Sequence, residues 1–467
     1  MVFSSIVFLF VFLPVVLALY YVVPAIRWKN VILLAASIIF YAWGEPVYIV
    51  LMLLSILFNF VMGLELERLR EDSRRKKLNL IFTVIVNLCI LGFFKYYGFL
   101  LGSINSAFHL HIPYRELALP VGISFYTFQT LSYILDLYRG DIKVQKNLLD
   151  FALYITMFPQ LIAGPIVRYV DIQEQLESRV ISWHKAGVGA EYFIKGLAKK
   201  VLLANTAGAV YTSIQGLGGE YQTVVTSWIG ILFYTMQIYF DFSGYSDMAI
   251  GLGKMMGFQF CKNFDYPYTS RSVTEFWRRW HISLGTWFRE YVYIPLGGNR
   301  VSVAKHIRNI LVVWALTGLW HGAAWNFVLW GLYYGVFLLL EKYLWGRYLE
   351  RLPGWVGNLY TMFFVIIGWV FFSNTDLGAG LAYLGSLFGV GVAGFANATT
   401  LFYLKSSLLL LVICIVCSRP WAYRWYKRVA GQRPVAAAVI NAVLLLLSIA
   451  FLVYDSYNPF LILDFKG

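Results

Sequence analysis

The feature that most constrains this sequence is an apolar stretch, Asn309 to Leu340, that contains no Lys, Arg, Asp or Glu. About 20 residues of helix cross a bilayer, so a stretch of this length predicts a membrane span. Its one side chain that titrates near neutral pH is His321. Because an ionisable group is costly in lipid, we expect His321 to face a polar cavity or another helix. Two interpretations stay open here: a buried general base, or a histidine satisfied by a neighbouring helix.

Glycines and tryptophans flank this histidine. Gly318 and Gly322 would let other groups approach the backbone closely, because glycine has no Cβ. The indoles of Trp320 and Trp325 would give apolar walls with a polar edge. Their N–H groups, and the amide of Asn326, are candidate donors to an oxyanion.

The composition places the whole chain in the membrane. The 467 residues are 60% hydrophobic and 13% charged, with a mean hydropathy of +0.66, whereas soluble proteins are about one quarter charged. The sequence therefore predicts an all-α polytopic membrane protein, with residues 1–467 as one membrane domain. We expect roughly eleven transmembrane helices plus shorter re-entrant or interfacial ones.

The net charge of +14 comes from short basic loops, such as the run between Arg68 and Lys77. Such loops are typical of the cytoplasmic side of membrane proteins and do not indicate nucleic-acid binding. The first apolar run, Val2 to Val23, has no basic residue before it, so we interpret it as a retained helix rather than a cleavable signal. Residues Leu101 to Arg115 are mixed in polarity, and one crossing after the basic run places them on the extracytoplasmic side. No metal site and no bound cofactor are expected.

Polar residues interrupt several of the expected spans. Gln129 lies within Leu119–Leu137 and is a candidate lining residue, because polar groups in membrane helices bond to other helices or line a path. Phe151 to Ile166 contains two prolines and predicts broken backbone. Asp241 and Asp247 are six residues apart and would not share a helix face. We expect them to be structural, capping broken helix ends or holding an internal arginine.

The stretch Ser270 to Arg300 is the least lipid-like. It interleaves tryptophans such as Trp277 with arginines such as Arg278 and Arg289. This pattern is typical of an interfacial helix, and it suits either a dock for a phosphate-bearing ligand or a set of membrane anchors. His281 follows Trp277 by four residues, so on one helix the two would share a face.

Five motifs carry a resemblance that covers much of residues 119–335: VGISFYTFQTLSYILDLYRG, FPQLIAGPIVRY, YFDFSGYSDMAIGLGKMMGF, NFDYPYTSRSVTEFWRRWHISLGTWFREYVYIPLGGNR and GLWHGAAWNFVLWGLYYG. With them the chain resembles the membrane-bound O-acyltransferase (MBOAT) family, most closely its bacterial branch of alginate O-acetylation proteins. The resemblance implies a ring of helices around a central funnel or tunnel. It also implies a signature core at about residues 119–345, with the C-terminal helices of 352–460 as scaffold.

The resemblance further implies that His321 is catalytic and that His281 belongs to the second signature of the site. The implied reaction moves an acyl group, most simply acetyl, from a cytoplasmic thioester such as acetyl-CoA to an exported or cell-surface polysaccharide. The implied setting is a bacterial cytoplasmic membrane, among membrane lipids, with an extracytoplasmic SGNH-type acyltransferase as partner. Two alternatives stay open: D-alanyl transfer to teichoic acid, as in a related branch, and a transporter of acyl groups or glycan that performs no chemistry.

Overall fold

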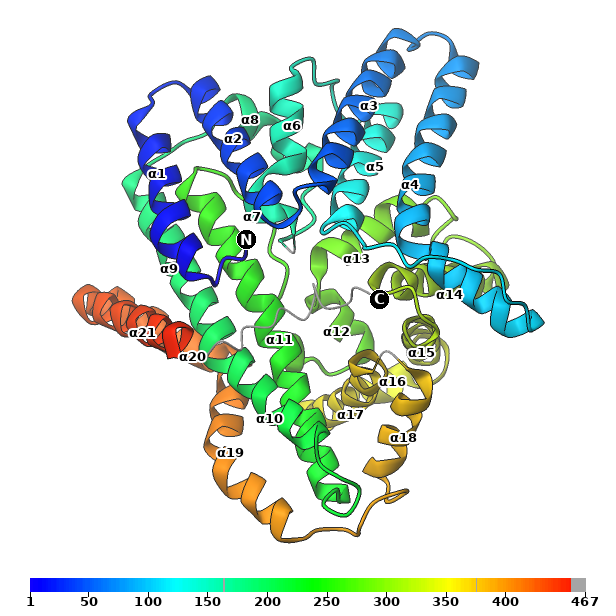
Figure 1. The fold of residues 1–467 in the computed structure, drawn as a ribbon, viewed down its shortest axis with the longest axis vertical. Coiled ribbons are helices and arrows are strands. Elements are labelled where there is room, and N and C mark those ends of the chain that lie inside the picture. The colour runs from blue at the N-terminus through cyan, green and yellow to red at the C-terminus, as the bar shows by residue number, and fades with distance from the viewer. Residues whose placement is uncertain (163, 375, 455–467) are drawn as a thin grey trace. The chain divides into compact units, whose positions relative to one another are not determined.

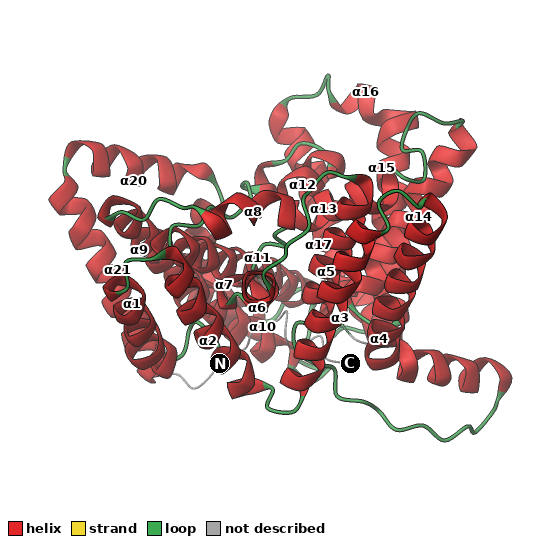
Figure 2. Cartoon of the chain, turned by 90° about the horizontal axis from the view of Figure 1, so that it is seen from above, coloured by secondary structure: helices red, strands yellow, loops and turns green. Residues whose placement is uncertain are grey.

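The computed structural model describes residues 1–162, 164–374 and 376–454. Those residues form helices joined by loops, and no strand occurs among them (Figure 2). Seven of the helices are long and apolar enough to cross a membrane. They are α2 (Ile26–Gly44), α3 (Tyr48–Arg68), α4 (Ser73–Phe108), α15 (Trp325–Leu340) with its continuation to Leu349, α17 (Gly354–Ser373), α19 (Ala398–Cys417) and α21 (Pro434–Tyr454). The predicted all-α membrane class is confirmed.

The expected number of eleven spans is not confirmed, because several apolar runs fold into shorter or interrupted helices. The first run forms only η1 (Phe8–Phe12) and α1 (Leu13–Val22), which fall short of a full span. The run at 119–137 becomes α5 (Ile123–Arg139), with 17 residues. The expected ring of helices around a funnel stays a prediction.

The chain divides into two compact units that alternate along the sequence. Among the described residues, unit 1 comprises Met1–Phe193 and Ser246–Cys261, and unit 2 comprises Ile194–Tyr245 and residues 262–454. Two helices, α9 (Trp183–Ala198) and α11 (Val224–Met255), contribute residues to both units. The single domain expected for residues 1–467 stays a prediction, and each unit is described by itself.

Unit 1 contains the hairpin of α3 and α4, which lie side by side (Figure 1). Helix α4 continues to Phe108, so the first eight residues of the mixed stretch Leu101 to Arg115 are helical, and the side of the membrane expected for this stretch stays a prediction. The expected break in 151–166 is confirmed, because α6 (Leu148–Thr156) ends three residues before Pro159. A turn of helix, α7 (Phe158–Leu161), follows, and α8 (Tyr169–Glu177) completes this part.

Unit 2 surrounds a core rich in aromatic rings, including Trp330, Tyr334 and Trp369, each at most 1% exposed. Besides the helices already given, its elements are η2 (Lys199–Asn205), α10 (Thr206–Gln215), η3 (Pro267–Thr269), α12 (Val273–Arg279), α13 (Ile282–Phe288), η4 (Arg289–Tyr293), α14 (Val303–His321), η5 (Glu341–Trp345), α16 (Gly346–Leu349), α18 (Leu377–Leu387) and α20 (Pro420–Gln432).

The apolar stretch 309–340 is not one continuous span. Helix α14 ends at His321 and α15 begins at Trp325, so the two helices form a tight hairpin. The expectation that glycines allow close approach is confirmed: a Cβ on Gly318 would collide with the backbone oxygen of Phe327, and one on Gly322 with the Phe327 ring. His321 therefore stands at a helix end beside a turn, not inside an uninterrupted helix.

The two ends of unit 2 differ in charge. At one end Lys342, which follows α15, and Tyr343 contact His306 near the start of α14, at 3.3 and 2.8 Å. Arg419, which follows α19, donates to Asn358 near the start of α17 at 2.9 Å, so several chain segments bring basic residues to this end. At the other end, the segments 216–223 and 376–397 contain no Lys or Arg. We call these the basic end and the non-basic end.

Candidate functional site

His321 is held by aromatic rings. Its imidazole meets the rings of Trp320 and Trp330 at centroid distances of 5.0 Å each, and the ring of Phe372 at 5.2 Å. All three contacts are edge-to-face, with interplanar angles of 84°, 82° and 77°. The side chain is partly exposed rather than buried. The packing fixes the orientation of the ring while leaving it accessible.

His281 is not on a helix face with Trp277, so that expectation is wrong. Helix α12 ends at Arg279, and His281 takes the left-handed conformation, with φ 45°, directly before α13. A residue with a Cβ pays for this conformation in steric strain. The chain reverses here, and the His281 side chain is almost completely buried, at 2% exposure.

The contacts of Asn263 define the protonation of His281. Asn263 Oδ1 accepts from the Ser283 hydroxyl at 2.9 Å and lies 3.2 Å from His281 Nδ1. Because that oxygen can only accept, Nδ1 must carry the proton and donate it. Nε2 is then the unprotonated nitrogen, and it has no hydrogen-bond partner among the described atoms. Burial lowers the pKa of His281, which lies outside the seven spans, to about 3. The ring is a neutral acceptor at physiological pH.

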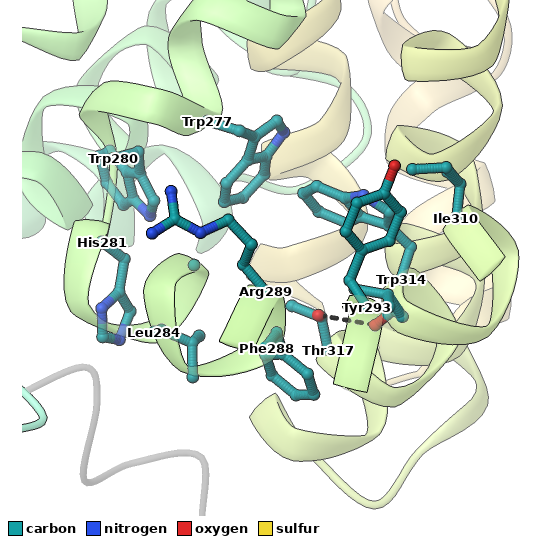
Figure 3. Close-up of a pocket in the computed structure, with 12 residues that line it drawn as sticks. Trp277, Trp280, His281, Leu284, Phe288, Arg289, Tyr293, Ile310, Trp314 and Thr317 are labelled. Atoms are coloured by element: carbon teal, nitrogen blue, oxygen red, sulfur yellow. Dashed lines mark hydrogen bonds between the residues drawn. The ribbon is translucent and has the colours of Figure 1, made fainter. Parts of the chain in front are cut away.

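His281 opens into a pocket of about 170 Å³ within unit 2. Figure 3 shows His281 on one side of this pocket and Ile310 and Tyr293 on the other, with Arg289 and Trp277 between them. The lining is mainly aromatic and aliphatic; its members are Trp277, Trp280, His281, Leu284, Gly285, Phe288, Arg289, Tyr293, Ile310, Val313, Trp314 and Thr317. We call it the aromatic pocket. Tyr293 ties it to the basic end, because its hydroxyl lies 2.9 Å from His306 Nε2.

Indole rings connect the aromatic pocket to His321. The ring of Trp277 lies 5.5 Å from that of Trp330, which packs on His321. The ring of Trp320 contacts both histidines, at 5.9 Å from His281 and 5.0 Å from His321. The two histidines therefore share one indole neighbour.

The single interfacial helix expected at Ser270 to Arg300 is wrong, because this stretch forms α12, α13 and η4. Arg289 reaches the aromatic pocket and pairs with Glu290 at 2.7 Å. Arg278 is exposed and does not line that pocket. Of the two arginines singled out, Arg289 is the one in position to meet a ligand there.

Two residues that follow His321, Trp325 and Asn326, differ in burial. The side chain of Asn326 is buried, and its amide donates to the backbone oxygens of Phe371, at 3.2 Å, and Asn374. The amide thus ties the start of α15 to the end of α17 instead of offering its N–H groups to a ligand. Trp325 is 57% exposed, so it is not a wall of an enclosed site.

The polar residues singled out in α11 and α5 are not among the residues that line the aromatic pocket. Asp241 pairs with buried Lys200 at 2.6 Å, so the cation beside it is a lysine rather than the expected arginine. Helix α11 continues unbroken through Gly244, so neither aspartate caps a broken helix end. Asp247 and buried Gln129 belong to unit 1, whereas both histidines belong to unit 2.

Sequence reasoning missed three groups that shape the site: Asn263, Trp330 and Phe372. Asn263 and Trp330 fall inside motifs that carried the resemblance, which was a usable signal. Phe372 lies in the part interpreted as scaffold, 51 positions after His321 by their numbers, and no local pattern marks it. Its contact with His321 exists only because α17 packs on α15.

The fold and the site define an all-helical membrane protein with two histidines arranged around a shared indole beside an aromatic pocket. The sequence model of the MBOAT, membrane-bound O-acyltransferase family, matches residues 141–376. The chain belongs to this family and is an O-acyltransferase.

Three relatives show the range of this similarity. A probable alginate O-acetylase AlgI of Pseudomonas aeruginosa is 44% identical over 396 residues, 84% of this chain and 75% of its own. A peptidoglycan O-acetyltransferase of Helicobacter pylori is 34% identical over 83% of this chain and 80% of its own. A teichoic acid D-alanyltransferase of Bacillus subtilis is 29% identical over 56% of this chain and 71% of its own.

Proposed function

We propose that unit 2 transfers an acyl group, most simply acetyl, from a thioester donor to a hydroxyl of an exported or cell-surface polysaccharide. The observation that carries this proposal is the setting of His321, whose ring is oriented by three aromatic neighbours yet remains partly exposed at a helix end. The named functions of the relatives support the choice, since two of those quoted are O-acetylases of cell-surface polymers.

The donor is an acyl thioester such as acetyl-CoA, and it enters from the basic end of unit 2. Basic loops favour the cytoplasmic side of a membrane, where such thioesters are made. The aromatic pocket reaches this end through Tyr293, and it offers an apolar lining for the acyl and thioester groups. Arg289, which lines the pocket with a side chain that is 61% exposed, offers a guanidinium for the donor's phosphates.

His321 acts as general base in the transfer. A ring nitrogen takes the proton of the acceptor hydroxyl while that oxygen attacks the thioester carbonyl. The tetrahedral intermediate collapses with cleavage of the carbon–sulfur bond, and the leaving sulfur takes the proton from the imidazolium. The products are an ester on the sugar and a free thiol, and base assistance of this kind contributes about 10²- to 10⁴-fold in rate.

His281 holds the donor rather than taking the acceptor's proton. Because Nδ1–H donates to Asn263, Nε2 accepts a hydrogen bond from an N–H or O–H group of the acyl donor in the aromatic pocket. A His281→Ala variant therefore impairs transfer less than a His321→Ala variant does. The setting we propose is the bacterial cytoplasmic membrane, with an SGNH-type protein on the outer side as a partner in acetylating the glycan.

The experiment compares His321→Ala with wild-type protein in a strain that lacks the endogenous gene, and scores ester on the cell-surface polysaccharide. We expect ester to fall by at least about 10²-fold while the protein accumulates normally in the membrane. His184→Ala removes an exposed histidine of unit 1 and serves as the matched control. Normal ester content in the His321→Ala strain would refute the mechanism and favour a transport role.

A further inference from the structure

Unit 2 has a second pocket, and its lining is more polar than that of the aromatic pocket. It has a volume of about 380 Å³, a size typical of small-ligand sites, and it lies between α10, α17, α18 and the loops beside them. Amides, a hydroxyl and small residues give it its character, in particular Gln215, Gln222, Asn374, Ala382 and Ser386. No Lys, Arg, Asp or Glu is among those of its lining residues that the structure describes. We call it the amide pocket.

The amide pocket is linked to the His321 region by α17. Asn374, one of its lining residues, accepts through its backbone oxygen from the buried amide of Asn326. Two residues earlier, Phe372 packs on the imidazole of His321. The same three-residue segment therefore touches the amide pocket on one side and the site histidine on the other.

The amide pocket lies at the non-basic end of unit 2. Gln222 comes from the loop 216–223, and Val390 and Gly391 from the segment 376–397, both of which lack Lys and Arg. The two charged groups of these segments are acidic, Glu220 and Asp376. By the distribution of basic loops, this end faces away from the cytoplasm, where an exported acceptor would arrive.

We propose that the amide pocket binds a sugar residue of the acceptor polysaccharide through its hydroxyl groups, without recognising a carboxylate. The inference rests on the proposed function, and it names the acceptor site for that reaction. Side-chain amides carry both donors and acceptors, as sugar hydroxyls do. Gln215 and Gln222 each donate one N–H within the protein, to the hydroxyls of Tyr211 and Ser227, so the second N–H and the oxygen of each amide can pair with sugar hydroxyls. Small residues such as Ala382 and Gly385 leave room for the sugar ring.

The absence of charge in the lining also excludes ligand classes. A phosphate or carboxylate buried without a cation or several N–H donors would lose its hydration uncompensated. A bound uronate must therefore turn its carboxylate to solvent. Binding should accordingly change little with salt, because screening acts on charged contacts and none of the described lining residues carries a charge.

The test measures direct binding to the purified full chain in detergent by ligand-observed NMR. The probes are a uronate tetrasaccharide, the same tetrasaccharide with its carboxyls reduced to alcohols, and a glycerol phosphate oligomer. We expect the two saccharides to bind with affinities within about threefold of each other, and the phosphate oligomer not to compete with them. Loss of binding on carboxyl reduction, or absence of saccharide binding, would overturn the inference.

Two variants place the saccharide in the pocket. Ala382→Trp adds an indole at an exposed lining position, and it should weaken binding at least about tenfold. Gln222→Leu removes an amide at similar shape and should weaken binding between about twofold and tenfold. Ser406→Trp, at an exposed position of α19 outside the pocket, is the matched control and should leave binding unchanged. Wild-type affinity in both pocket variants would refute the site.

The binding assay separates this inference from the proposed reaction. His321→Ala should bind the saccharides as wild-type protein does, because the acceptor pocket does not contain His321. If Ala382→Trp weakened saccharide binding but the wild-type protein transferred no acyl group, the proposed function would be refuted and sugar binding in the amide pocket would be supported. If Ala382→Trp transferred acyl groups with an unchanged KM for the acceptor, sugar binding in the amide pocket would be refuted and the proposed function would be supported.

Discussion

His281 and His321 lie in the same unit and share the indole of Trp320, yet they are held in opposite ways. His281 is buried, its backbone is left-handed, and a hydrogen bond to Asn263 fixes which nitrogen carries the proton. His321 has ordinary helical backbone, partial exposure and three aromatic edges around it. Hydrogen bonding specifies the chemical state of the first ring, whereas packing specifies the orientation of the second.

This difference separates two tasks that a single histidine could not perform equally well. A ring that must take a proton and return it needs access to its reactants and an orientation that survives the change of charge. A ring that must only accept a hydrogen bond benefits from full burial, since burial keeps it neutral. The comparison therefore assigns proton transfer to His321 and donor placement to His281.

The largest effect should come from disturbing the packing that holds His321. In Gly318→Ala the new Cβ would collide with the backbone oxygen of Phe327, so the α14–α15 hairpin could not close as it does. We expect a loss of about 1–3 kcal/mol in the free energy of unfolding, measured as a fall in Tm in detergent, together with loss of acyl transfer.

Gly92→Ala, in α4, is the matched control, because a Cβ there meets nothing within 4 Å. This change should leave Tm unchanged or raise it, since alanine favours helix over glycine by about 1 kcal/mol. If Gly318→Ala were as stable as Gly92→Ala, the close contact between α14 and α15 would not be what positions His321.

The next effect should come from the hydrogen bond that sets the state of His281. Asn263→Asp keeps the acceptor for Nδ1–H but adds a negative charge beside the ring, which raises the pKa of His281 from about 3. Protonation of Nε2 turns it from an acceptor into a donor, so transfer by the variant should fall as pH decreases through the raised pKa.

In the wild-type protein His281 stays neutral above about pH 3, so it should contribute no acid limb to the pH–rate profile between pH 5 and 8. The measurement is that profile for wild-type and Asn263→Asp protein at saturating acceptor. Asn263→Leu, which removes the acceptor, should lower the rate without adding a limb. An acid limb that is the same in wild type and Asn263→Asp would show that His281 is not controlled by residue 263.

Much of the fold could be predicted from the sequence, because long apolar runs indicate membrane helices. The apolar runs at 31–43, 47–64 and 355–372 predict spans, and α2, α3 and α17 match them within five residues at each end. The hairpin of α14 and α15 was missed because both helices and their turn are apolar. Only the glycines at 318 and 322 hinted at a reversal, and an isolated glycine is also tolerated inside a continuous helix.

The site was predictable as far as it is local. His321, His281 and Trp277 could be singled out as candidates, because each stands out chemically against its own stretch. Phe372 and the amide pocket were not, since they arise from α17 and α18 packing on segments far away in the sequence. The break before His281 was also invisible, because the residues between Trp277 and Trp287 contain no proline and only one glycine, Gly285.

The smallest effect distinguishes the two histidines by their backbones alone. At residue 281, φ is 45°, where glycine is tolerated and a side chain costs about 1–2 kcal/mol, so His281→Gly should be more stable than His281→Ala. At residue 321, the last of α14, the helical backbone favours alanine over glycine by up to about 1 kcal/mol. The prediction is a reversal of sign: Tm should be higher for Gly than for Ala at 281, and lower for Gly than for Ala at 321. Each pair lacks the same imidazole, so lost ring contacts cancel within it. If the Tm values of the Gly and Ala variants had the same order at both positions, the strained turn before α13 would not exist in solution. The fixed protonation state argued for His281 would then lose its structural basis.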